Sequence, residues 1–154
     1  MMVVMILLIA GALAAPRLGD SNVTRLSEAA KLLAADLAYA QSESMAHADD
    51  PRLVVFDTTA HAYRIAPTSE PDTPITNPAG GLPYVTTLGQ GRARQLQGVT
   101  IQGHSLEGDD RVAFGIYGQL DQATDATVTL AAGGKTVTVT INAISGEATI
   151  GDVN

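Results

Sequence analysis

The chain begins with an uninterrupted apolar segment. Residues 1–16 contain no charged side chain, and Arg17 is the first charge. A helix rises about 1.5 Å per residue, so this segment spans roughly 24 Å, a few residues short of the roughly 30 Å hydrocarbon core of a membrane. The side chains expected to form a membrane and assembly helix are Val3, Val4, Ile6, Leu7, Leu8, Ile9, Leu13 and Pro16.

This apolar segment has three interpretations. A cleavable signal peptide fits its length and the small residues Ala12, Ala14 and Ala15, but no Lys or Arg precedes the apolar run. A buried core helix also fits, since runs of this length are common in cores. A membrane helix fits if a few residues are missing at its start. The stretch that follows favours the third interpretation, because it continues the helix.

Residues 21–47 have the period of an amphipathic helix. Ala and Leu dominate this stretch, and both are strong helix formers. Charged residues such as Asp36 fall mostly outside its apolar face, and Pro16 loosens or kinks the join to the apolar segment. Apolar residues recur at three- to four-residue spacing and predict one face that packs on a sheet; they are Leu26, Ala30, Leu33, Leu37 and Ala40.

From Pro51 the period changes to that of β-strands. Short runs rich in Val, Ile, Phe and Tyr alternate with turns, and VTLAAGGKTVTVTI around Gly133 and Gly134 is the strongest hairpin signal. The Pro-rich stretch 67–83 predicts a loop. The expected strands are 52–57, 61–66, 84–87, 94–102, 111–117, 128–131, 135–142 and 147–150.

Together these elements predict an α+β fold, in which a long N-terminal helix packs on antiparallel β-sheets of a small head. The helix has an apolar half and an amphipathic half. We expect an apolar helix segment at 1–16, its amphipathic continuation at 17–50 and a β-rich globular head at 51–154. A chain of 154 residues suits one domain plus an anchor.

Composition excludes several functions. The formal net charge is −7, and an acidic surface repels nucleic-acid phosphates. The absence of cysteine excludes disulfides, thiolate metal sites and a Cys nucleophile. The three histidines, His47, His61 and His104, lack zinc-ligand spacing, so we interpret each as solvated or locally hydrogen-bonded.

The remaining polar clusters have simple explanations. Acidic pairs within 109–125 offer oxygen ligands, but the EF-hand pattern is absent and we do not predict a calcium site. Arg92 and Arg94 are the compact basic pair, and we interpret them as a solvated turn. We therefore predict no catalytic residue, no cofactor and no metal, and hence no enzyme.

Three stretches carry a specific resemblance. VVMILLIAGALAAPRL (3–18) resembles the N-terminal helix of type IV pilins and type II secretion pseudopilins. AAKLLAADLAYAQSESMAHADD (29–50), followed by RLVVFDTTAHAYRI (52–65), resembles the minor pseudopilin H group, the GspH/FimT-like pseudopilins. In that group a helix ending in a D-L-x-Y-A-Q-S-E-A type sequence leads into a strand. Here Asp36 to Glu43 match this motif, and Ser44 stands in its last place. The resemblance covers residues 1–66, and FGIYGQLD (114–121) is similar to part of the family's head.

The resemblance implies a pilin-like head and a structural function. It implies a single-pass protein of the bacterial inner membrane, methylated at its mature N-terminus, with its C-terminal head in the periplasm. The implied partners are other pilin or pseudopilin subunits, the inner membrane and the assembly platform of the secretion or pilus machine. The family's basic leader, Gly-Phe and following Glu do not precede Met1. We therefore expect the chain to start about half a dozen residues inside the mature pattern. Restoring these residues would lengthen the apolar helix to about 33 Å, enough to span a membrane.

Two alternative functions stay open. One is an exported β-rich binding domain with a cleaved signal peptide. The other is a DNA-uptake minor pilin, although the C-terminal GEATIGDVN is acidic rather than basic, so nucleic acid is not an expected partner.

Overall fold

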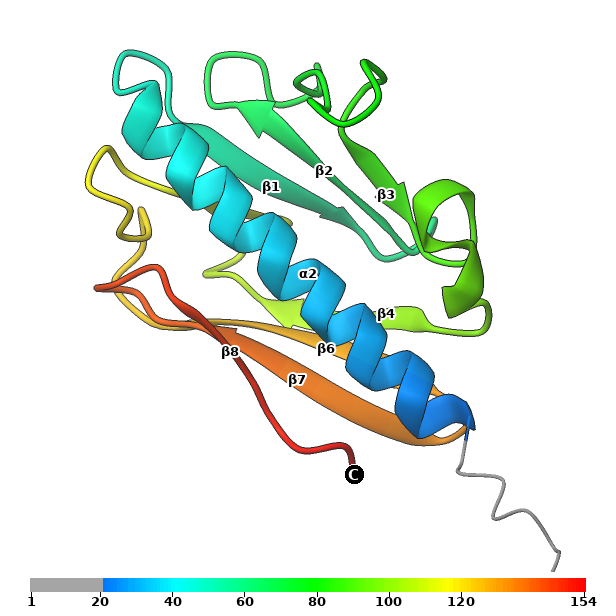
Figure 1. Cartoon of the computed structure of the whole chain (residues 1–154). Coiled ribbons are helices and arrows are strands. Elements are labelled where there is room, and N and C mark those ends of the chain that lie inside the picture. Colours follow the sequence, from blue (N-terminus) through cyan, green and yellow to red (C-terminus); the bar gives the residue numbers. More distant parts are fainter. Residues whose placement is uncertain (1–20) are drawn as a thin grey trace, which may run out of the picture.

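The structure, a computed structural model, describes residues 21–154 (Figure 1). Within these residues one long helix, α2 (Ser21–Ala46), lies across two four-stranded antiparallel sheets. The predicted fold, a helix packed on antiparallel sheets, is therefore confirmed. The apolar segment 1–16 lies outside the described residues. No helix of the described part is long and apolar enough to cross a membrane.

The buried face of α2 holds the two sheets together. The helix contacts β1 of one sheet and β6, β7 and β8 of the other. Burial of these side chains contributes about 25 cal/mol for each Å² of apolar surface removed from water. The core residues on this face are Leu26, Ala29, Ala30, Leu33, Leu37 and Ala40, each at most 2% exposed.

The first sheet has the strand order β3-β2-β1-β5. A tight hairpin joins its central strands, and the Asp57 carboxylate accepts the backbone N–H groups of Thr59 and Ala60 in the turn. β3 lies at one edge of the sheet. The strands are β1 (Arg52–Asp57), β2 (Ala62–Pro67), β3 (Val85–Thr87) and β5 (Arg111–Ala113).

The second sheet has the strand order β4-β6-β7-β8. Gly133 and Gly134 form the β6–β7 turn with φ of 58° and 79°, the left-handed conformation that a two-residue hairpin turn requires and glycine adopts easily. This hairpin is the one that the sequence predicts most strongly. The strands are β4 (Thr100–Ser105), β6 (Ala126–Ala132), β7 (Lys135–Ile141) and β8 (Ala148–Ile150).

The strand expected at 94–102 is wrong in its first half. A short 3₁₀ helix, η1 (Gly91–Leu96), occupies this part, and β4 begins only at Thr100. The turn is kinked at Ala93, whose φ of −105° and ψ of 20° are not helical, and both Ala93 and Leu96 are completely buried. Burial of this pair in a kinked turn replaces the extended backbone that the strand prediction required.

The strand expected at 111–117 ends early, at Ala113. Phe114 pairs only with Leu120, through an isolated bridge. Between them a narrow turn forms, in which the N–H of Gly115 donates to the Gln119 carbonyl at 2.7 Å. The next residues of the family-like stretch FGIYGQLD therefore form a projecting loop rather than a strand.

Candidate assembly surface

The residues predicted from the sequence to have a role fall into two groups. The membrane and assembly residues, from Val3 to Pro16, lie outside the described residues. The helix-packing residues, from Leu26 to Ala40, lie in the core of the head, where they contact both sheets. A surface of the described part that is available to other molecules therefore lies elsewhere.

Exposed apolar side chains gather where two loops meet the end of α2. Tyr117 is 83% exposed on the loop 115–119, and Ile144 is 87% exposed on the loop 142–147. The two residues line a shallow hollow of ≈ 540 Å³ whose floor includes Leu120. Met45, near the end of α2, is half exposed. We call Met45, Tyr117 and Ile144 the loop-end patch. Figure 1 shows both loops at the opposite end of the head from the start of α2.

Gln41 joins the two loops of this patch. Its side-chain amide donates to the Gly118 carbonyl at 2.8 Å and to the Ser145 carbonyl at 2.7 Å. Gly146 brings the loops into backbone contact, because a Cβ there would lie 1.9 Å from the Gly118 oxygen. Met45 belongs to the same junction, since its sulfur would lie 3.2 Å from a Cβ at Gly118. One helix side chain and two glycines therefore position the patch.

Each loop also has its own internal brace. The Asn142 side chain accepts the backbone N–H groups of Ile144 and Ser145 at 3.0 and 2.9 Å. The Gln119 side chain accepts the backbone N–H of Tyr117 at 3.2 Å. Backbone groups that bond within a loop restrict its conformations, so both exposed apolar side chains are carried on constrained backbone.

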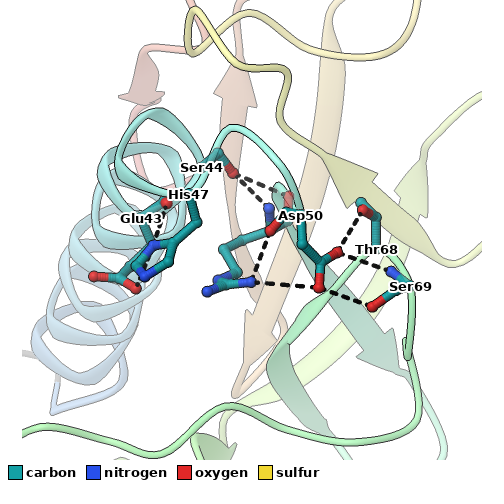
Figure 2. A network of polar contacts seen from close by, with 7 residues as sticks. Glu43, Ser44, His47, Asp50, Thr68 and Ser69 are labelled. Carbon is teal, nitrogen blue, oxygen red and sulfur yellow. Dashed lines mark hydrogen bonds and ion pairs between the residues drawn. The ribbon is translucent and has the colours of Figure 1, made fainter.

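A polar network fixes the end of α2 beside the patch (Figure 2). The buried Ser44 hydroxyl accepts the backbone N–H of Arg52 at 2.7 Å, which ties the helix to β1. Asp50 accepts from the Ser69 hydroxyl at 2.8 Å and from its backbone N–H at 3.1 Å. These hydrogen bonds from Ser69 lower the pKa of Asp50. Ser44 therefore holds the end of α2, which carries Gln41, against β1. Asp50 holds the chain after α2 against the loop that follows β2.

A buried polar cluster lies beneath the middle of α2, and the sequence did not reveal it. Asp36 is only 3% exposed, and it accepts the hydroxyls of Tyr63 at 2.6 Å and Tyr84 at 3.0 Å. The Arg92 guanidinium forms an ion pair with the same carboxylate. The placement of Asp36 outside the buried face and the interpretation of Arg92 as part of a solvated turn are therefore wrong.

The partners of Asp36 explain why it is buried. They lie between 27 and 56 residues away along the chain, on β2, just before β3 and on η1, so no local pattern marks them. Burial, and then the charge of Asp36, raise the pKa of Tyr63 well above its ordinary value and that of Tyr84 to about 12. Both phenols thus stay protonated and donate to the carboxylate. Tyr39 stacks on Tyr84 with ring centroids 5.2 Å apart, and the cluster clamps β3 and η1 onto the helix.

Two of the acidic residues considered for calcium accept backbone hydrogen bonds. Asp125 accepts the N–H of Ala143 at 2.8 Å, and Asp109 accepts the N–H of Arg111 at 3.1 Å. Within residues 21–154, no group of three His, Asp or Glu side chains is placed to hold a metal ion. The ring nitrogen of His47, the residue after α2, contacts Glu43 in the last turn of the helix.

No protein-family model and no curated protein sequence matches this chain. Its fold matches two solved structures, each with a TM-score of 0.55. The minor pseudopilin EpsH of the type 2 secretion system of Vibrio cholerae is 13% identical, over 83% of this chain and 97% of that one. The type IV minor pilin FimU of Pseudomonas aeruginosa is 16% identical, over 82% of this chain and 92% of that one. The chain therefore has the pilin-like fold of minor pseudopilins and minor type IV pilins, as the resemblance of its sequence predicts.

Proposed function

We propose that this protein is a minor pilin-like subunit of a bacterial envelope filament, of the type II secretion or type IV pilus type. One observation carries the proposal: the apolar segment 1–16 directly precedes the amphipathic helix of a head with the pilin-like fold. Both structures with a similar fold are structural subunits by name, which also supports a non-enzymatic role.

The proposed mechanism is assembly through the N-terminal helix. The segment that contains Val3, Leu8 and Leu13 lies in the inner membrane before assembly, with the head in the periplasm. It then exchanges lipid contacts for contacts with equivalent helices of other subunits. Lipid tails and apolar side chains are similarly apolar, so this exchange depends on packing rather than on burial from water. The start of α2 and the loop-end patch lie at opposite ends of the head, which leaves the patch accessible in the anchored subunit (Figure 1).

The proposal is tested by the fate of the apolar segment. We expect the full chain to fractionate with the inner membrane and its mature form to retain residues 3–15 by mass spectrometry. Leu8→Lys should reduce membrane retention, since a lysine at the centre of a membrane helix costs about 2.5–3.5 kcal/mol. Leu8→Ile is the matched control and should leave retention unchanged.

Two results would replace the proposal by an alternative. Cleavage after Ala14 or Ala15, with release of the head into the periplasm, would support an exported binding domain with a signal peptide. Salt-sensitive retardation of DNA in a gel-shift assay would instead support a DNA-uptake minor pilin.

A further inference from the structure

We infer that the loop-end patch is a docking site for a different protein subunit, one whose contacting surface presents an apolar side chain flanked by Lys or Arg. The inference rests on the proposed function and deepens it by naming the chemistry of a partner of the head. It is carried by the exposure, the rigidity and the charge of the patch.

The loop-end patch is strongly exposed. Tyr117 and Ile144 expose most of their side chains on either side of one hollow. Scattered apolar residues are normal on a surface, but large apolar side chains gathered around a hollow mark an interaction site. Tyrosine is among the residues that contribute most to binding when a partner covers it.

The loop-end patch is also held rigidly. The two amide hydrogen bonds from Gln41 and the close approach of Gly118 and Gly146 hold the loops against each other. A surface that is ordered before binding loses less conformational entropy when the partner arrives. Gln41 is accordingly a positioning residue, which acts through the two loops and is itself only half exposed.

Charge identifies the partner. Residues 112–134 and 136–154 contain four acidic residues and no Lys or Arg. Two of them, Asp121 and Glu147, are exposed and lie close in the sequence to residues that line the hollow. Arg111 lies with Asp121 along an adjoining hollow, but it is already paired with Asp109 and Asp110. Within the described helix, the last turn of α2 holds no basic residue, and the carbonyl end of a helix adds negative potential. Lys135, the one basic residue of 112–154, is the first residue of β7 and lies at the opposite end of the head, next to the Gly133–Gly134 turn.

The same charge argues against a second copy as the occupant. A symmetric contact between two copies brings each patch against an identical one, and like charges then repel. In a head-to-tail contact between copies the hairpin end that carries Lys135 would face the patch, but no large apolar side chain is exposed within residues 126–141 to fill the hollow. A basic partner surface gives complementary potentials and faster association. The occupant is therefore a different subunit.

Photo-crosslinking of the full chain in its native envelope tests this inference. p-Benzoylphenylalanine replaces Tyr117 or Ile144, and adducts are digested and mapped by mass spectrometry. Leu82 is the control position, because it is 71% exposed on the loop 67–83, among a different set of surface residues. We expect positions 117 and 144 to yield the same adduct with a different protein, and position 82 not to yield it. The crosslinked site on the partner should lie next to a Lys or Arg. Adducts only with a second copy, identical adducts from position 82, or no adduct would overturn the inference.

Two further variants test charge and positioning through the adduct yield at position 117. Reversing Asp121 and Glu147 to lysine should lower the yield at least severalfold, whereas Glu70→Lys, an exposed control, should not. Gln41→Leu should also lower the yield, with Gln102→Leu on β4 as its control. Circular dichroism of each purified chain checks that the fold is intact. Unchanged yields from the folded Asp121 and Glu147 double reversal would contradict a charge-complementary partner.

The outcomes separate this inference from the proposed function. If the apolar segment is retained in the inner membrane but the patch yields no heterologous adduct, the docking inference fails and the proposed function stands. If the segment is cleaved and the head is released, the proposed function fails, whatever the patch contacts.

Discussion

Replacing Asp36 by alanine removes the charge at the centre of the polar cluster beneath α2. The substitution leaves the buried Tyr63 hydroxyl without its acceptor and the Arg92 guanidinium without its counter-ion. Breaking one side of a buried ion pair costs about 3–5 kcal/mol. The Arg92 side chain is 34% exposed, so water compensates part of its lost pairing. We therefore expect a loss near the low end, about 3 kcal/mol.

Equilibrium urea unfolding of the full chain, followed by circular dichroism, measures this loss. For an unfolding slope of about 2 kcal/mol per molar urea, a loss of about 3 kcal/mol lowers the midpoint by about 1.5 M. Asp72→Ala is the matched control, because Asp72 pairs with Arg64 at 2.7 Å but its side chain is 95% exposed. An exposed pair contributes less than about 1 kcal/mol, so this control should scarcely move the midpoint.

A double-mutant cycle identifies the source of the loss. Arg92→Met in the Asp36→Ala background removes the charge left without a partner, so the double variant should be more stable than the sum of the single losses predicts. A coupling energy of about 1–3 kcal/mol is expected for groups in direct contact. If Asp36→Ala costs no more than Asp72→Ala, or if the coupling is absent, the description of Asp36 as a buried charge held by Arg92 is refuted.

Three other predictions concern the loops and the titration of the head. Gly146→Ala should cost more than about 2 kcal/mol in urea unfolding, because it adds left-handed strain at φ 69° to a clash with the Gly118 oxygen. Because the pKa of Asp50 is lower in the folded state, its ionised carboxylate stabilises the fold at pH values above the ordinary pKa of 3.8. This contribution is lost as the pH falls through the lowered pKa of the folded state. Ser69→Ala should therefore lower the melting temperature at neutral pH more than in acid. Burial raises the pKa of Tyr63 above its ordinary value of 10.0, so the stability of the fold should decrease as the pH rises past that value. Tyr63→Phe should therefore lose less stability than the unmodified protein between about pH 8 and about pH 11.

Each of these predictions has a control and a contrary result. Gly134→Ala has left-handed strain at φ 79° but open space around it, so it should cost only about 1 kcal/mol, and an equal cost at the two glycines would argue against the clash. If Ser69→Ala leaves the melting temperature unchanged at every pH, the Asp50 hydrogen bonds do not stabilise the fold. An alkaline loss that persists in full in Tyr63→Phe would assign it to another group.

The helix and the main hairpin were predictable because their signals are local. The spacing of Leu26, Leu33 and Leu37 predicts which face of α2 packs on the sheets, since neighbouring turns of one helix alone define that face. Gly133 and Gly134 predict the β6–β7 turn because few other residues adopt the required backbone conformation. The strand prediction for 94–102 failed in its first half because tertiary contacts bury Leu96 in the short helix η1.

The candidate surface was less predictable than the fold. The sequence marked Gln41 as part of a family-like motif, and FGIYGQLD as a family-like stretch, but nothing connected them. Gln41 and Ser145 are 104 residues apart, and Asp36 and Arg92 are 56 apart, so only the folded chain brings either pair together. The sequence by itself determined the helix, the strand-forming runs and the acidic charge of the head, because these depend on composition and on neighbouring residues. The tertiary structure alone decided which polar groups are buried and which apolar groups stay exposed, because both depend on contacts between distant segments.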